Sequence, residues 1–148
     1  DKNGVPKTLE FNCRMGDPET QPIMARLKSD LVDVLDHAID GTLDKVDLDW
    51  DKRIALGVVM AAHNYPDTPR ADDEITGIPE EDESHVVFHA GTTIKDGKLV
   101  TSGGRVLCVV GLDGTAKGAQ DRAYEALEKI HFDGAQYRKD IGHLAIKR

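Results

Sequence analysis

Apolar and polar residues alternate along residues 5–14 (VPKTLEFNCR), the pattern of a half-buried strand. The Asn3-Gly4 pair just before this segment favours a tight hairpin turn. A hairpin needs a strand on each side of its turn, and this chain offers none before Asn3. We therefore expect a longer protein to supply the preceding strand.

A helix is predicted over residues 22–41. Pro22 suits the first turn of a helix, and Gly41 suits the position just after its end. Between them, apolar residues recur at steps of three and four, at Met24, Leu27, Leu31, Leu35 and Ala38. This spacing predicts one continuous helix with a single apolar face.

The rest of the chain predicts strands over residues 53–63, 85–94, 98–101 and 105–112. A tight turn is expected at residues 95–98 and a turn or bulge at 102–104, while the polar residues 64–83 form a long surface loop. A second helix opens at Gly114-Thr115, and residues 137–148 pack back on the domain. The elements do not form a series of strand–helix–strand units, so the predicted class is α+β, with an antiparallel-rich sheet packed with helices.

Composition excludes several classes of protein. The chain has 148 residues, 39% of them hydrophobic, which is enough to form a core. Its net charge of −8 and the absence of a basic cluster make nucleic acid and anionic membranes poor partners. The longest apolar runs are too short to span a bilayer, and we find no targeting segment. The chain begins at Asp1, which we interpret as a start within a larger protein.

The acidic stretches and the two cysteines indicate which segments face solvent and in which compartment the protein resides. The acidic stretches at residues 44–51 and 72–83 are interpreted as solvated loops. Cys13 and Cys108 each lie in an apolar, strand-like run, so we expect both to be reduced and buried, without a disulfide or a metal. Reduced cysteines suit a cytoplasmic protein.

Candidate chemistry gathers at the first predicted strand. Residues two apart share a face of a strand, so Glu10, Asn12 and Arg14 point one way and the apolar residues between them point toward a core. Carboxylate and amide oxygens suit a hard divalent ion, and a guanidinium suits a phosphoryl group. A plain strand with a polar outer face is the alternative. Asp17 and Glu19 follow at once on a loop with Gly and Pro, which favours a site.

The stretch RMGDPETQ, residues 14–21, resembles the signature of the phosphoribosylamine–glycine ligase family. Later segments are similar to the C-terminal domain of the same family, namely KSDLVDVL (28–35), GVVMAA (57–62), VFHAGT (87–92), GGRVLCV (103–109) and RKDIG (138–142). The resemblance covers nearly the whole chain.

This resemblance implies an ATP-grasp enzyme of purine biosynthesis, which uses ATP to join glycine to 5-phosphoribosylamine through glycyl phosphate. It implies that Glu10 and Asn12 are ligands of Mg²⁺ or Mn²⁺ and that Arg14 binds the phosphoryl group of ATP in catalysis. Asp17 and Glu19 match catalytic carboxylates near the acyl acceptor.

The resemblance also implies a division into two parts. Residues 1–40 would be the last strand and helix of an ATP-grasp domain, and residues 41–148 the C-terminal α+β domain packed against it. The ATP-grasp lysines and the adenine pocket would lie in a missing N-terminal part, so this chain alone is expected to be inactive. Two alternatives remain open: a sister ATP-grasp carboxylate–amine ligase, or a non-catalytic folding or interaction module.

Weaker candidates have structural interpretations. Residues 101–105 (TSGGR) are compatible with phosphate binding, although a turn between strands is favoured. His89 is interpreted as a hydrogen-bonded core histidine and Trp50 as a packing anchor. Arg138, Lys139 and Asp140 are interpreted as a structural ion-pair cluster. The histidines and cysteines show no zinc-binding spacing.

Overall fold

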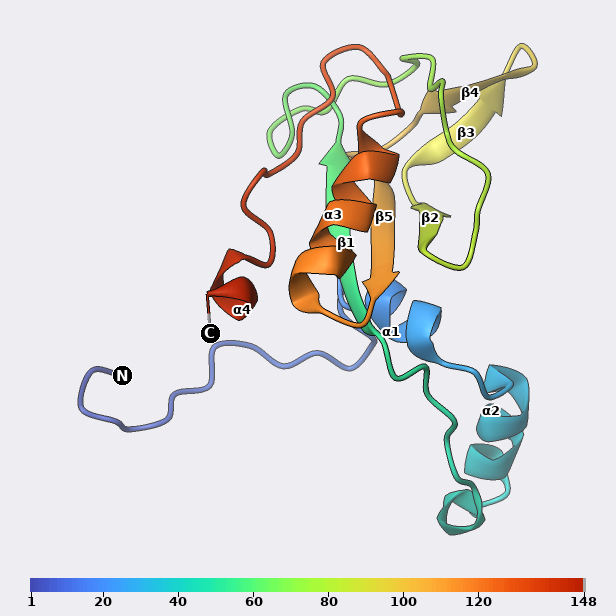
Figure 1. The fold of residues 1–148 in the computed structure, drawn as a ribbon, viewed down its shortest axis with the longest axis vertical. Helices are drawn as coiled ribbons and strands as arrows, with labels where there is room; N and C mark the ends of the chain where they lie inside the picture. The colour runs from blue at the N-terminus through green and yellow to red at the C-terminus, as the bar shows by residue number, and fades with distance from the viewer. Residues whose placement is uncertain (148) are drawn as a thin grey trace.

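The computed structural model describes residues 1–147 and shows an antiparallel sheet with one long helix lying on its face (Figure 1). The sheet has three strands in the order β1-β5-β2, formed by β1 (Ile54–Ala61), β5 (Arg105–Asp113) and β2 (His85–His89). A separate hairpin consists of β3 (Thr92–Lys95) and β4 (Lys98–Thr101). The predicted α+β class with an antiparallel sheet is confirmed.

Strand β5 is the centre of the core. It pairs with both β1 and β2, and residues 106–112 are all buried. This explains why its sequence is a continuous apolar run instead of an alternating one, since both faces of the strand are covered. Helix α3 (Ala116–Leu127) covers one face, and the segment around α1 (Thr20–Arg26) lies against the other.

Helix α3 packs unusually close to β5. Its buried face includes Ala119 and Ala123, and a Cβ atom added at Gly111 of β5 would lie only 2.2 Å from the Ala119 carbonyl oxygen. The helix begins where the sequence predicted it: the Thr115 hydroxyl accepts a hydrogen bond from the Gly118 amide at 3.0 Å. Small residues on both sides therefore set the spacing between the helix and the sheet.

The predicted turn at residues 95–98 is also confirmed. Asp96 and Gly97 have φ angles of 52° and 76°, as a two-residue hairpin turn requires. The single strand predicted over residues 85–94 is wrong, because it divides into β2 and β3 at Ala90-Gly91. A Cβ at Gly91 would lie 2.7 Å from the Gly103 Cα atom, so the chain bends where the two backbones meet.

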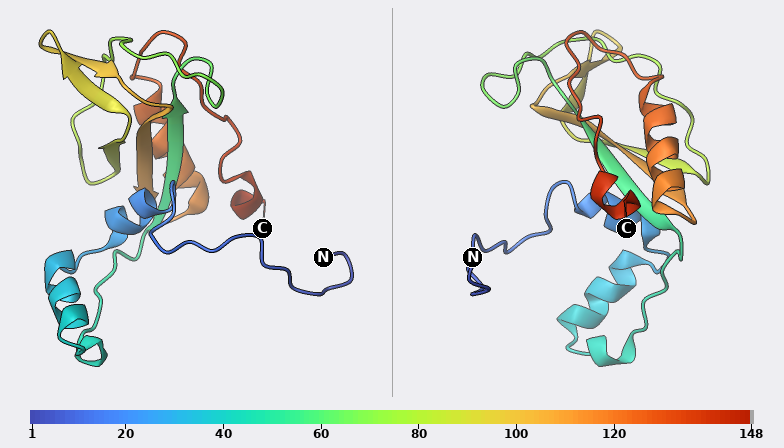
Figure 2. Two further views of the ribbon diagram at one scale, coloured as in Figure 1. Left: turned by 180° about the vertical axis from the view of Figure 1, so that it is seen from behind. Right: turned by 60° about the vertical axis from the view of Figure 1, so that its left-hand side comes forward.

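The single helix predicted over residues 22–41 is wrong as well. It consists of α1 and α2 (Leu31–Ile39), which a break at residues 27–30 separates. The Lys28 amide donates to the Asp49 carbonyl oxygen at 2.9 Å, and the Asp30 side chain caps α2 through the Val32 amide. No residue of α2 is buried, and Figure 2 shows it projecting from the sheet.

Residues 5–14 do not form the predicted strand. The segment is irregular and exposed, with Leu9 96% and Phe11 93% accessible to solvent. Across residues 1–147, no strand lies beside it, and a strand needs a hydrogen-bonded neighbour. Cys13 is consequently exposed and not buried as predicted, whereas Cys108 is buried and both are free thiols.

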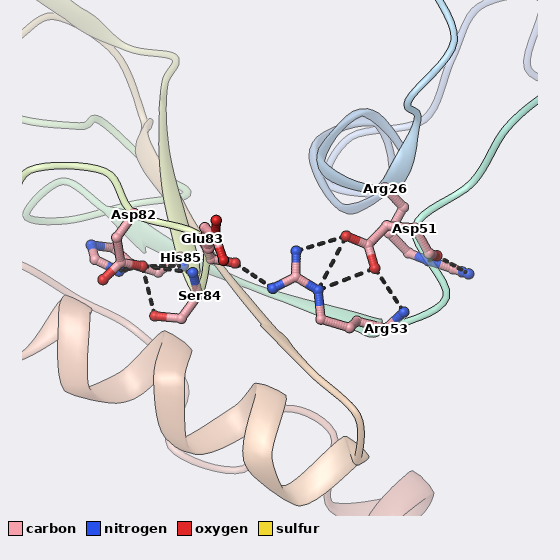
Figure 3. Close-up of polar contacts among 7 residues, drawn as sticks. All are labelled: Arg26, Asp51, Arg53, Asp82, Glu83, Ser84 and His85. Carbon is pink, nitrogen blue, oxygen red and sulfur yellow. Dashed lines mark hydrogen bonds and ion pairs between the residues drawn. The ribbon is translucent and has the colours of Figure 1, made fainter.

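One ion pair and several hydrogen bonds hold α1 at the start of β1 (Figure 3). The Arg53 guanidinium donates to both carboxylate oxygens of Asp51, with contacts of 2.6–3.1 Å, and to the Glu83 carbonyl oxygen. Arg26 of α1 donates to the Asp51 carbonyl oxygen at 3.0 and 2.9 Å. The hydrogen bonds that Asp51 accepts from the Arg53 guanidinium, followed by the one from the Arg53 backbone amide, hold the pKa of the Asp51 carboxyl well below its usual range. The Asp51 side chain is also half-buried, whereas the sequence predicted that residues 44–51 form a solvated loop.

The C-terminal segment packs back on the domain as expected, ending in the short helix α4 (His143–Ile146). The Tyr124 hydroxyl donates to the Arg138 carbonyl oxygen at 2.6 Å. Of the predicted cluster, Arg138 pairs with Asp140 at 2.7 Å, and Lys139 takes no part in an ion pair within residues 1–147. His89, predicted to be a core histidine, is exposed, and the buried histidine is His85. A short 3₁₀ helix, η1 (Leu43–Lys45), precedes Trp50.

Candidate functional site

Glu10 and Asn12 lie side by side in the exposed segment. The Asn12 Nδ2 atom donates a hydrogen bond to Glu10 Oε1 at 3.1 Å, so the two side chains share one side as their spacing predicted. This contact uses neither the second carboxylate oxygen of Glu10 nor the amide oxygen of Asn12. Both are hard oxygen donors, the type that Mg²⁺ prefers. The pair is therefore chemically suited to contribute two ligands to a divalent ion.

The acidic, histidine and cysteine side chains of residues 1–147 do not form a complete metal site on their own. No group of three or more of these residues is arranged to hold a metal ion among residues 1–147. Mg²⁺ in nucleotide-dependent enzymes is commonly bound through one or two protein groups together with phosphates and water. Glu10 and Asn12 fit such a partial ligand set.

Arg14 does not join the other candidates. Its Nη1 atom donates to the Met15 carbonyl oxygen at 2.8 Å, and the side chain is exposed. Within residues 1–147 it forms no hydrogen bond or ion pair with the four other candidate side chains. Within the described residues, the guanidinium thus hydrogen-bonds to the backbone of the next residue and to no other candidate group.

The acidic loop, defined here as residues 15–19, connects this segment to α1. The Glu19 carboxyl group folds over Gly16, where an added Cβ would lie 2.6 Å from Glu19 Oε2. The Thr20 amide and hydroxyl both donate to the Gly16 carbonyl oxygen, at 3.0 and 2.5 Å. A larger residue at position 16 would require the flexible, exposed Glu19 side chain to move aside.

Asp17 is attached to the central strand of the sheet. Arg105 Nη1 lies 3.0 Å from Asp17 Oδ2 and donates to the Asp17 carbonyl oxygen at 2.9 Å. Gln21 Nε2 approaches Asp17 Oδ1 at 3.4 Å. The contact between residues 17 and 105 brings together parts of the chain that are 88 positions apart.

Arg105 itself is held by a tyrosine. Its Nε atom donates to the Tyr65 hydroxyl oxygen at 3.1 Å. The Tyr65 ring lies against Gly104, where a Cβ would be 2.5 Å from the ring. The Asp17 carboxylate, followed by the Tyr65 hydroxyl, raises the pKa of the Arg105 guanidinium above its ordinary value. No local pattern in the sequence predicts this arrangement. Residues 102–104 connect β4 to β5, where a turn or bulge was predicted.

A pocket of about 570 Å³ opens beside the acidic loop. Its walls include Pro18, Tyr65, Arg105, Gln136, Tyr137 and Arg138. Cys108 lies beneath the loop, and burial raises the pKa of its thiol to about 12, with a further contribution from the Asp17 carboxylate. A neutral thiol of this kind fills space and is a poor nucleophile.

A second hollow, of about 450 Å³, lies between α1 and the beginning of β1. Pro22, Ile23, Arg26, Trp50 and Ala55 line it. Trp50 is therefore a wall of an open surface hollow and is only partly packed. Among residues 1–147, no helix has both the length and the apolar composition needed to cross a membrane.

Comparison with known proteins agrees with this architecture. The family described as "Phosphoribosylglycinamide synthetase, C domain" matches residues 55–144. The chain is 75% identical over 148 residues to the phosphoribosylamine–glycine ligase of Ralstonia nicotianae, covering 100% of this chain and 35% of that protein. It is 57% identical over 149 residues to the ligase of Neisseria meningitidis serogroup A, again with 100% and 35% coverage.

A solved structure shares the fold. The crystal structure of phosphoribosylamine–glycine ligase from Thermotoga maritima matches with a TM-score of 0.80 and 43% identity, covering 94% of this chain and 34% of that one. The chain thus spans about a third of the length of the curated relatives it matches.

The antiparallel sheet, its covering helix and the acidic loop attached to β5 define an α+β domain of the type found within larger ligases. The match over residues 55–144 is more than half of the chain. The chain belongs to the phosphoribosylglycinamide synthetase C-domain family.

Proposed function

We propose that this chain is the C-terminal part of an ATP-dependent ligase that joins glycine to 5-phosphoribosylamine in purine biosynthesis. The observation that carries the proposal is the 75% identity to a phosphoribosylamine–glycine ligase along all 148 residues. The residues before position 55 lie outside the matched family domain but inside this longer alignment. This alignment therefore spans the positions of the whole candidate site.

The reaction has two steps. A carboxylate oxygen of glycine bonds to the γ-phosphorus of ATP while the bond to the β–γ bridging oxygen breaks, giving glycyl phosphate and ADP. The amine of 5-phosphoribosylamine then attacks the acyl carbon, the bond to phosphate breaks, and the nitrogen loses a proton. The products are glycinamide ribonucleotide, ADP and phosphate.

Each candidate residue has a role in this proposal. Glu10 and Asn12 hold Mg²⁺ or Mn²⁺, and a bound divalent ion would neutralise charge on the phosphates of ATP. Arg14, whose fork of N–H donors matches phosphoryl oxygens, stabilises the group in transfer. Asp17 and Glu19 offer carboxylates that attract an amine or accept its proton. The neighbouring side chains of Glu10 and Asn12 and the contact between Asp17 and Arg105 support these roles.

We assign residues 1–40 to the end of an ATP-grasp domain and residues 41–148 to the C-terminal domain of the ligase. The exposure of Leu9 and Phe11 supports this division, because an apolar segment of this kind is normally covered by a neighbouring sheet. The remainder of a full-length protein, about two thirds of the relatives' length, would supply that sheet and the nucleotide pocket.

The two free thiols support a cytoplasmic location, where cysteines remain reduced. In that compartment ATP, glycine and 5-phosphoribosylamine would be the small-molecule partners of the full-length ligase.

The test is an assay of the full-length protein that carries this sequence. ADP and glycinamide ribonucleotide should form in equal amounts when ATP, glycine and 5-phosphoribosylamine are all present, as followed by mass spectrometry. The 148-residue chain alone should give no product. Turnover with a different carboxylate–amine pair would indicate a sister ligase, and no turnover with any pair would indicate a non-catalytic module.

A further inference from the structure

We propose that Arg105 is a positioning residue that fixes the direction of the Asp17 carboxylate, with Tyr65 as its support. The kinetic part of this inference rests on the proposed ligase function, whereas the geometric part stands on the contacts alone. Neither Arg105 nor Tyr65 lies in the sequence signature of residues 14–21. Their assignment comes from the fold.

The first argument is the pattern of contacts. One nitrogen of Arg105 reaches both the side chain and the backbone of Asp17, at 3.0 and 2.9 Å. The guanidinium therefore fixes the main chain of the acidic loop as well as its carboxylate. A pair that used the carboxylate alone would leave the loop free to rotate about it.

The second argument is the rigidity of the support. Arg105 begins β5, whose next seven residues are buried at the centre of the sheet. Its Nε atom is bound to the Tyr65 hydroxyl, and the absence of a side chain at Gly104 allows the Tyr65 ring to lie there. The side chain is thus held at both its base and its head. An arginine already ordered in this way loses little conformational entropy when it binds Asp17.

The third argument is location. The pocket beside the loop is lined by Pro18, Tyr65 and Arg105, so the loop held by Arg105 forms part of its wall. Asp17 is one of the two candidate carboxylates, with Glu19, for glycine or for the incoming amine. Small displacements of such a group reduce rates sharply, because the reacting atoms must be aligned within a fraction of an ångström.

Arg70 offers a matched control. Its side chain is 40% exposed, the same as that of Arg105, and it also forms ion pairs, with Asp73 and Asp133. These contacts join the loop of residues 64–83 to Asp133 and do not involve the acidic loop. Loss of Arg70 should therefore reproduce the loss of a partly exposed arginine without affecting Asp17.

The experiment uses the full-length ligase with Arg105→Gln, Arg105→Lys and Arg70→Gln. Hydrogen exchange of the peptide covering residues 15–21 should be faster in Arg105→Gln and unchanged in Arg70→Gln. In steady-state kinetics, Arg105→Gln should lower kcat/KM for glycine or for 5-phosphoribosylamine by about 10- to 100-fold, with the KM for ATP unchanged. Arg105→Lys keeps the charge and should recover part of the loss. Arg70→Gln should stay within about twofold of the parent protein.

Each possible outcome either supports or overturns the positioning role of Arg105. Unchanged hydrogen exchange in Arg105→Gln would overturn the positioning role whatever the kinetics. Faster exchange with unchanged kinetics in an active ligase would show that Arg105 holds a loop outside the reaction, which also overturns it. If the parent protein has no ligase activity, the proposed function fails, and the exchange result alone still decides whether Arg105 fixes the loop.

Discussion

Replacement of Gly111 by alanine should destabilise the domain, because β5 and α3 approach each other at this glycine. An added Cβ would lie 2.2 Å from the Ala119 carbonyl oxygen and 2.5 Å from the Ala123 nitrogen. Both are backbone atoms of α3, so no side chain can rotate away to make room. Ordinary contact begins near 3.4 Å, and the helix would have to retreat by about 1.2 Å, the difference between 3.4 and 2.2 Å.

The cost follows from that retreat. Overpacking of a filled core typically costs about 3 kcal/mol at its upper end. Alanine has less backbone freedom than glycine in the unfolded chain, which offsets roughly 0.5–1 kcal/mol. The net loss should therefore be about 2 kcal/mol, equivalent to a fall in Tm of roughly 4–8 °C for a domain of this size.

Urea denaturation of the 148-residue chain, followed by circular dichroism, measures this loss as a lower midpoint with an unchanged m-value. Gly114→Ala is the matched control, since a Cβ there meets nothing within 4 Å. It should match or slightly exceed the parent chain in stability. If Gly111→Ala is as stable as Gly114→Ala, the close packing of α3 on β5 is wrong.

Three further predictions concern Arg14, Asp51 and the thiols. Arg14→Lys in the full-length ligase keeps the positive charge but loses the forked N–H geometry, so kcat should fall by a larger factor than the KM for ATP rises. A change in the KM for ATP alone would mean that Arg14 binds ATP in the ground state and does not stabilise the group in transfer. Because the pKa of Asp51 is lowered in the folded protein, its ionised carboxylate stabilises the fold. This stabilisation is complete above the unfolded-state pKa of about 3.9 and is lost as the pH falls through the lower folded-state pKa. Arg53→Gln should therefore be less stable than the parent at pH 7, by a margin that narrows below about pH 4 in thermal melts; a constant margin would contradict this. Cys13 should react quickly with a thiol reagent at pH 8 while Cys108 reacts only on unfolding, and equal rates would contradict the burial of Cys108.

The sequence predicted those elements whose signals are local. The hairpin at Asp96-Gly97 and the beginning of α3 at Thr115 depend on residues within one turn of each other, and both were correct. The predicted helix over residues 22–41 failed because apolar spacing continues across the break at residues 27–30. The Ser29-Asp30 pair, whose side chains bind the Asp49 and Val32 amides, was the signal that would have located the second helix.

The strand predicted over residues 5–14 failed for a different reason. Alternation describes a segment that would suit a strand, but a strand exists only where a neighbour supplies hydrogen bonds, and no neighbour lies beside these residues in the described chain. The same alternation correctly placed Glu10 beside Asn12. The contact between Asp17 and Arg105 depends on tertiary structure alone, and no local pattern could predict it.

The central claim is that residues 10–19 belong to the active site of a ligase, and substitution of Glu10 tests it most directly. Glu10 is exposed and its side chain hydrogen-bonds only to Asn12 within residues 1–147, so Glu10→Ala should leave Tm nearly unchanged. Glu81, another exposed carboxylate, provides the control variant Glu81→Ala.

The measurement is the rate of ADP formation by the full-length protein with saturating ATP, glycine and 5-phosphoribosylamine. Loss of a metal ligand from a phosphoryl-transfer site should lower kcat by about 100-fold or more in Glu10→Ala, with Glu81→Ala unaffected. Full activity of a folded Glu10→Ala protein would contradict the account.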